Sequence, residues 1–300
     1  MTNKTDDRGS LGMFVASMLI FGTIGVVRRY IPVPSAFLAF ARGTLGGLFL
    51  LAFVKLRGKK ASRPMPPRLL LRLALTGAMI GFNWVLLFEA YRYTTVAIAT
   101  LCYYMQPTMV MLLSPAVFRE RLSGKQLICV LVSVAGMALI SGVAGGGGPG
   151  RQHMTGILLG LGAAALYAGV VIANKKTQGV DAYQRTTVQL LAAGVIMAPY
   201  LLLTDGFSGI VCTPSTLLLL LVAGIIHTGV AYALYFGSME RLRVQTIAML
   251  SYIDPVSALL FSALLLKEPL NGMQLIGACL IMGSAMMSET GIRKADRGAD

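Results

Sequence analysis

Residues 101–110 read LCYYMQPTMV, with a glutamine and a proline in the middle of an otherwise apolar stretch. Residues 249–258 read MLSYIDPVSA and repeat the order aromatic, apolar, polar, proline 148 positions later. Proline removes one backbone donor from a helix, and its ring clashes with the carbonyl group four residues earlier. The two stretches therefore predict two helices that are broken in the same way, half a chain apart.

The rest of the chain is too apolar for a water-soluble domain. Of its 300 residues, 56% are hydrophobic and 13% are charged, whereas a soluble domain carries roughly 25% charged residues. Because an apolar helix of about 20 residues crosses a bilayer, the apolar segments predict membrane spans. Ten spans are predicted, at residues 11–27, 34–54, 69–88, 94–117, 124–141, 155–174, 184–203, 214–236, 244–266 and 271–288.

The basic residues predict how these spans are oriented. If the N-terminus is cytoplasmic, about 20 Lys and Arg lie in the inner segments and five in the outer loops. This bias is the positive-inside rule, and it predicts that both termini are cytoplasmic. It also explains the net charge of +14 without a nucleic-acid partner. The basic loop 55–72 is compatible with weak attraction to anionic membrane lipids.

The two halves of the chain resemble each other. At an offset of 148, residues 81–136 and 229–284 share 14 identities in 56 positions, including Pro107/Pro255. Each half has five predicted spans, and since five is odd, the second half enters the membrane from the opposite side. The sequence thus predicts an all-α integral membrane protein of ten transmembrane helices, built as two inverted five-helix repeats.

The predicted repeats are residues 1–144 and 151–300, joined by a Gly-rich linker at 145–150. Proline at mid-span leaves a carbonyl group that would cost several kcal/mol if it faced lipid. We therefore expect Pro107 and Pro255 to face the protein interior and to act as hinges.

Polar and aromatic residues gather near the breaks and in equivalent spans of both halves. Core packing explains any one aromatic residue more simply, but a cluster repeated in both halves favours a cavity at mid-depth. The candidate substrate-binding residues are Asn83, Trp84, Tyr104, Tyr167, His227, Tyr232, Tyr252 and Asp254. Apart from Asp254, this predicted cavity has few fixed charges.

The charged residues near the spans have competing explanations. An ionisable group at mid-depth, such as Asp254, is usually functional, but Asp254 could equally be the N-cap of a helix that restarts at Pro255. Arg42 is predicted to extend to the outer interface rather than to bind a substrate. Glu120 and Glu268 are predicted to satisfy or balance helix termini.

The sequence gives no sign of an enzyme. It contains no HExxH, GxSxG or Walker motif and no paired carboxylates within the spans. His153 and His227 are the only histidines, so we expect neither a histidine metal site nor a cofactor.

Each half closes with a proline, a glutamate and then Gly-x-Gln-Leu-Ile, in QPTMVMLLSPAVFRERLSGKQLI and DPVSALLFSALLLKEPLNGMQLI. This arrangement resembles the drug/metabolite transporter superfamily of the EamA type, over nearly the whole chain. Length and aromatic content are similar to the YddG-type amino-acid exporters of bacterial inner membranes. The resemblance implies export of neutral or aromatic amino acids, or similar small metabolites, through a central cavity. Because a chain of ten spans can enclose its own pathway, we expect a monomer.

Other transport functions stay open at this point. A drug, nucleotide-sugar or cation exporter is possible, and Asp254 could serve a proton-coupled antiporter. A membrane scaffold or receptor is disfavoured, because alternating access explains an inverted repeat and scaffolding does not.

Overall fold

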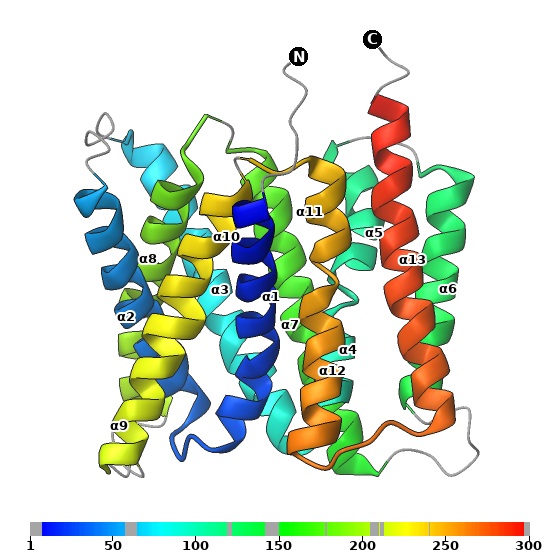
Figure 1. Cartoon of the computed structure of the whole chain (residues 1–300), viewed down its shortest axis with the longest axis horizontal. Coiled ribbons are helices and arrows are strands. Elements are labelled where there is room, and N and C mark those ends of the chain that lie inside the picture. Colours follow the sequence, from blue (N-terminus) through cyan, green and yellow to red (C-terminus); the bar gives the residue numbers. More distant parts are fainter. Residues whose placement is uncertain are drawn as a thin grey trace.

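The computed structural model describes residues 8–57, 65–118, 122–141, 150–177, 179–204, 210, 213–239 and 241–296. This part of the chain is helical and contains no strand (Figure 1). The first half forms α1 (Arg8–Arg29), α2 (Ser35–Leu56), α3 (Pro67–Tyr93), α4 (Val96–Tyr103), α5 (Gln106–Phe118) and α6 (Gly124–Ser141). The second half forms α7 (Arg151–Lys175), α8 (Ala182–Thr204), α9 (Pro214–Leu221), η2 (Val222–Val230), α10 (Ala231–Met239), α11 (Val244–Leu250), α12 (Ile253–Leu265) and α13 (Gly272–Asp296).

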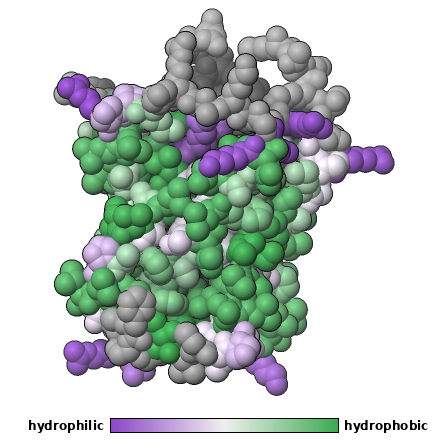
Figure 2. Space-filling model, turned by 90° about the vertical axis from the view of Figure 1, so that its left-hand side faces the viewer, coloured by the Kyte–Doolittle hydropathy of each residue, from purple (hydrophilic) through white to green (hydrophobic). Residues whose placement is uncertain are grey.

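The helices form an upright bundle with an apolar belt. Eight helical segments of the described chain are long and apolar enough to cross a membrane, and 253–265 and 272–287 are shorter apolar helices. Figure 2 shows apolar residues over most of one face, with hydrophilic residues at both ends. Exposed leucines such as Leu71, Leu203 and Leu217 belong to a surface suited to lipid. The chain is therefore a multi-pass membrane protein.

The start of α1 and the end of α13 lie at the same end of the bundle (Figure 1). We call this end the terminus end. The α1–α2 and α12–α13 connections lie at the opposite end, which we call the far end.

Both predicted helix breaks are confirmed. One lies between α4 and α5, and the other between α11 and α12. Pro107 is the second residue of α5, and Pro255 is the third residue of α12. Proline is tolerated in the first turn of a helix because a backbone donor there has no intrahelical acceptor. Each proline therefore starts a new helix after the break.

The predicted span 214–236 contains a π-helix, η2, between α9 and α10. Sequence periodicity did not predict it. In this segment the Thr228 hydroxyl donates to the Ala223 carbonyl, five residues back, at 2.9 Å. A π-helix shifts the following side chains around the helix axis and is often found at functional sites.

Two GxxxG pairs predict close helix contacts, and the structure confirms both. Gly43 and Gly47 in α2, and Gly77 and Gly81 in α3, all approach α8. A Cβ atom on Gly43 would lie 2.6 Å from the Gly194 backbone nitrogen. Glycine thus lets α8 lie directly against both helices.

Candidate functional site

A cavity of about 550 Å³ lies in the middle of the bundle, between the two broken helices. Its wall draws on α1, α2, α3, α4, α5, α7, α8, α10 and α12, while none of its described lining residues belongs to α6 or α13. Aromatic side chains make up much of the wall: Phe21, Trp84, Tyr91, Tyr103, Tyr104, Tyr167, Tyr232, Tyr235, Phe236 and Tyr252. The volume suits a small molecule.

The aromatic side chains pack against one another across helices. The ring of Tyr103 lies 5.7 Å from that of Tyr167 in α7, and the ring of Phe21 lies 5.3 Å from that of Tyr232 in α10. Offset and edge-to-face pairs at such distances stabilise a fixed ring arrangement. The wall therefore offers apolar surface in a set geometry.

Eight substrate-binding residues were predicted from the sequence, and five of them are aromatic. All five aromatic residues line this cavity: Trp84, Tyr104, Tyr167, Tyr232 and Tyr252. Asp254 and the predicted hinge Pro107 line it as well. The other hinge, Pro255, is buried outside the lining.

Asn83 and His227 do not line the cavity. Asn83 is 1% exposed, and its Nδ2 donates to the Ala163 carbonyl at 2.6 Å, which ties α3 to α7. His227 Nε2 lies 2.9 Å from the Thr23 hydroxyl of α1. Both polar side chains thus join helices behind the cavity wall.

Asp254 connects the two broken helices. The Tyr104 hydroxyl, from the first break, donates to Asp254 Oδ2, beyond the second break, at 2.6 Å. The N-cap explanation of Asp254 is wrong: the N-cap of α12 is Tyr252, which makes no side-chain capping bond. Asp254 is instead the second residue of α12, where the helix dipole favours a negative charge.

The prediction that Arg42 reaches the outer interface is wrong. Arg42 is 5% exposed and lines the cavity. Its Nε donates to the Thr228 hydroxyl at 3.0 Å, and its guanidinium carbon lies 4.3 Å from the Trp84 ring centroid. The π-helix that presents Thr228 could not be read from the sequence, so the inward direction of Arg42 was missed.

The helix α8 contributes polar residues that sequence reasoning did not assign to the cavity. Gln189 Nε2 donates to the Thr76 hydroxyl at 2.7 Å and to Asn174 Oδ1 at 2.8 Å. Arg185 also lines the cavity. With Arg42 and Asp254, this makes three charged lining residues, more than the sequence led us to expect.

The cavity extends toward the terminus end and stops short of the far end. Asn174 lies in the last turn of α7, and Arg185 in the first turn of α8, at the terminus end (Figure 1). At the other extreme the lining includes Tyr91 and Thr100 but none of the residues that join the helix ends beyond them.

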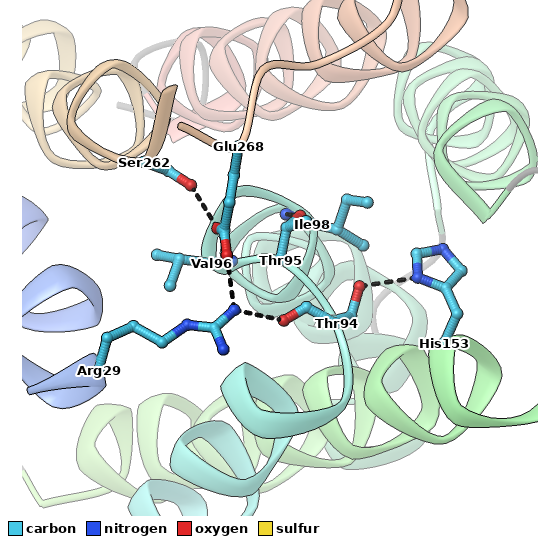
Figure 3. Close-up of polar contacts among 8 residues, drawn as sticks. All are labelled: Arg29, Thr94, Thr95, Val96, Ile98, His153, Ser262 and Glu268. Atoms are coloured by element: carbon cyan, nitrogen blue, oxygen red, sulfur yellow. Dashed lines mark hydrogen bonds and ion pairs between the residues drawn. The ribbon is translucent and has the colours of Figure 1, made fainter. Parts of the chain in front are cut away.

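Those helix ends meet in a polar group that we call the far-end cluster: Arg29, Thr94, Val96, Ser262 and Glu268 (Figure 3). Arg29 Nη2 donates to Glu268 Oε1 at 2.6 Å and to the Thr94 carbonyl at 3.1 Å. Glu268 Oε2 accepts from the Val96 backbone nitrogen and the Ser262 hydroxyl, both at 2.9 Å. One carboxylate thus connects α1, α4 and α12.

Val96 is the first residue of α4, so Glu268 satisfies a helix terminus, as predicted. Glu120 lies outside the described residues. The chain turns toward Glu268 at Lys267, whose φ is +57°. A side chain other than glycine is disfavoured in this left-handed conformation, and the Glu268 backbone nitrogen stabilises the turn by donating to the Ser262 carbonyl at 3.2 Å.

The family of the chain follows from comparison with known proteins. The model of the EamA-like transporter family matches residues 9–142 and, a second time, residues 154–290. The chain belongs to the EamA-like transporter family. It is therefore a transporter and not an enzyme, as the absence of catalytic motifs predicted.

Named relatives of this EamA-like transporter agree. It is 30% identical over 245 residues to the uncharacterized transporter YxxF of Bacillus subtilis, covering 82% of this chain and 78% of the relative. It is 33% identical over 248 residues to a probable amino-acid metabolite efflux pump of Salmonella typhimurium, covering 77% and 80%. The threonine/homoserine exporter RhtA of the same species is 26% identical, covering 84% and 81%.

A solved crystal structure has the same fold. It superposes with a TM-score of 0.67 at 22% sequence identity, covering 96% of this chain and 98% of that one.

Proposed function

We propose that this transporter exports neutral or aromatic amino acids, or similar small metabolites, across the bacterial inner membrane by alternating access. The observation that carries the proposal is the aromatic cavity of about 550 Å³ between the two broken helices. Relatives named as an amino-acid metabolite efflux pump and a threonine/homoserine exporter support the substrate class.

Alternating access needs two halves that can exchange conformations. We propose ten membrane-spanning segments in two inverted five-helix repeats, with α4–α5, α9–η2–α10 and α11–α12 each crossing as one interrupted segment. Two matches to one family model and equivalent breaks before Pro107 and Pro255 support the repeat. The shared end of α1 and α13 (Figure 1) agrees with an even number of crossings.

The far-end cluster provides the closed side of such a cycle. In this state the cavity reaches the terminus end, while the cluster joins the helix ends beyond Tyr91 and Thr100. With both termini cytoplasmic, as the positive-inside rule favours, this is an arrangement that loads substrate from the cytoplasm. Opening the outer side would require the Arg29–Glu268 pair to separate.

The proposal is tested by flux of labelled L-phenylalanine, L-leucine and L-threonine in proteoliposomes that contain the purified protein. Saturable flux above that of protein-free vesicles is expected for at least one of them. If none of the neutral amino acids crosses faster than in protein-free vesicles, the substrate class is wrong.

One observation favours a second candidate, a proton-coupled exporter of drugs or other metabolites. Asp254 lines the cavity, and its carboxylate makes no ion pair within the described residues. A carboxylate in such a place can carry a proton. Substrate accumulation driven by a pH gradient in wild type and absent in Asp254→Asn would select this candidate, whereas equal flux with and without the gradient favours facilitated diffusion.

The orientation can be tested by thiol labelling. In a cysteine-free background, Gly150→Cys before α7 is expected to react with an impermeant maleimide added outside intact cells. Arg68→Cys in the first turn of α3 should react only after the cells are opened. Both positions are exposed. The reverse pattern would place the termini outside, and reaction of both positions from the same side would contradict the inverted arrangement.

The hinge prediction is tested with Pro107→Ala and Pro255→Ala. Either substitution restores a backbone donor at a helix break and is expected to lower flux several-fold with little change in folded protein. Pro199→Ala is the matched control, because Pro199 lies inside α8 and outside the cavity lining. Wild-type flux in both break variants would show that the prolines serve packing alone.

A further inference from the structure

Arg42 is a buried positive charge in the cavity lining, and no described carboxylate forms an ion pair with it. The structure gives it one hydrogen bond, from Nε to the Thr228 hydroxyl, and no ion pair within the described residues. A guanidinium group buried without an anion is unfavourable. The protein thus maintains an unpaired charge at a place that a small molecule can reach.

Two contacts hold the guanidinium group in a fixed orientation. Thr228 accepts from Nε on one edge, and the rings of Trp84 and Phe88 lie at 4.3 Å and 5.3 Å from the guanidinium carbon. Cation–π contacts of this kind contribute roughly 0.5–2 kcal/mol. The Thr228 bond and the two ring contacts use one nitrogen and the flat faces, so the two terminal nitrogens stay available.

The terminal nitrogens of Arg42 donate to no described protein group, and neither is among the buried unpartnered atoms. They therefore face space that a ligand can enter. The outer edge of a guanidinium group pairs with a carboxylate through two parallel hydrogen bonds, a geometry that a lysine cannot match.

The other charges of the cavity favour the same ligand group. Arg185 lines it nearer the terminus end, and Asp254 is the one acidic residue in the described lining. The lining therefore carries a net positive charge, which attracts anionic groups toward Arg42. Asp254 accepts from Tyr104 and forms no ion pair with Arg42 among the described residues, so it does not neutralise the guanidinium group by direct contact.

We propose that Arg42 binds the carboxylate of the transported molecule and thereby restricts the substrates to carboxylic acids, amino acids among them. The proposal rests on the proposed function in taking this cavity as the transport site. It assigns Trp84 a double role, as the ring that orients Arg42 and as part of the wall for the substrate side chain.

Trp84 is the single tryptophan of the chain, so its fluorescence reports directly on the neighbourhood of Arg42. We would titrate purified protein in nanodiscs with L-phenylalanine and with L-phenylalaninamide, which keeps the ammonium group and replaces the carboxylate by a neutral amide. Wild type is expected to bind phenylalanine at least about tenfold more tightly than phenylalaninamide, since loss of a charge-assisted hydrogen bond costs roughly 1.5–3 kcal/mol.

Arg42→Gln should bind both ligands with nearly equal affinity. Arg42→Lys should keep part of the preference, because it retains the charge without the two parallel bonds. Arg92→Gln, on an exposed pair outside the cavity, is the control and should retain the full preference. A preference that persists in Arg42→Gln, or that wild type lacks, overturns the proposal.

A third ligand separates this proposal from the proposed function. Binding of 3-phenylpropanoate, which has a carboxylate and no ammonium group, should depend on Arg42 in the same way. If proteoliposomes carry no amino acid but this acid binds in an Arg42-dependent manner, the exported substrate class is wrong while the carboxylate site stands. If amino acids are carried but the binding of no ligand depends on Arg42, the carboxylate site is wrong while the exported substrate class stands.

Discussion

Gly77→Leu is expected to yield at least about tenfold less folded protein than wild type, because overpacking a tight contact costs roughly 1–3 kcal/mol. A Cβ atom at this position would lie 2.5 Å from the Gln189 carbonyl oxygen and 2.8 Å from Ala192 Cβ, both in α8. The backbone of α8 cannot move aside as the end of a flexible side chain can. To admit a leucine, α8 would have to move away from α3 and give up the bond between Gln189 and Thr76.

The measurement is the amount of monodisperse protein recovered in detergent, together with its thermal unfolding midpoint. Gly12→Leu is the matched control, since no other group lies within 4 Å of a Cβ atom at that position in α1. It should be recovered at wild-type levels. Equal recovery of Gly77→Leu would mean that α3 and α8 are not held at the distance described.

Glu268→Gln is expected to open the far end of the cavity. The Glu268 side chain is 18% exposed and accepts three hydrogen bonds, one of them from the Arg29 guanidinium group. Hydrogen bonds to a charged group contribute roughly 1.5–3 kcal/mol each. Glutamine keeps the size but loses the charge, so the closed arrangement of α1, α4 and α12 loses stability.

A cysteine at the lining position Thr100 reports on this opening. With Glu268→Gln, its labelling by an impermeant reagent from the far side of the membrane should become at least about tenfold faster, corresponding to about 1.4 kcal/mol. Glu89→Gln is the control, because the ion-pair partner of Glu89 among the described residues is the neighbouring, largely exposed Arg92 at the same end. Unchanged labelling in Glu268→Gln would show that the cluster does not close the cavity.

The sequence predicted the features that depend on local chemistry. A proline removes a backbone donor from its helix, and its recurrence after a polar residue at equivalent mid-span positions predicted both breaks, at Pro107 and Pro255, whereas Pro199 lies inside the unbroken helix α8. A GxxxG pair marks a close contact, although it does not say that α8 is the partner of all four glycines. Five of the ten aromatic wall residues were predicted, because aromatic residues recur in equivalent spans of both halves.

Features that depend on side-chain direction or on distant partners were not predicted. Arg42 could have extended outward, and its inward direction depends on Thr228 in a π-helix that no periodicity reveals. Asn83 and His227 are polar and lie in apolar spans, but each makes a hydrogen bond to another helix behind the cavity wall, and Asn83 Oδ1 has no partner among the described residues. Polarity alone does not distinguish such a residue from one that faces a cavity.

The far-end cluster was also missed as a unit. Its members come from positions 29, 94, 96, 262 and 268, which only the folded chain brings together. The recurrence of Glu120 and Glu268 after the same pattern was the one available signal. It identified a helix terminus correctly but could not identify Arg29 as the partner.

Substrate protection of a cavity cysteine tests most directly whether this cavity is the transport site. Val110 in α5 lines the cavity, and Val110→Cys in a cysteine-free background places one thiol there. Saturating L-phenylalanine is expected to slow thiol modification of the reconstituted protein several-fold, and completed modification should abolish phenylalanine flux. A labelling rate that phenylalanine does not change, together with full flux after modification, would show that the substrate crosses elsewhere.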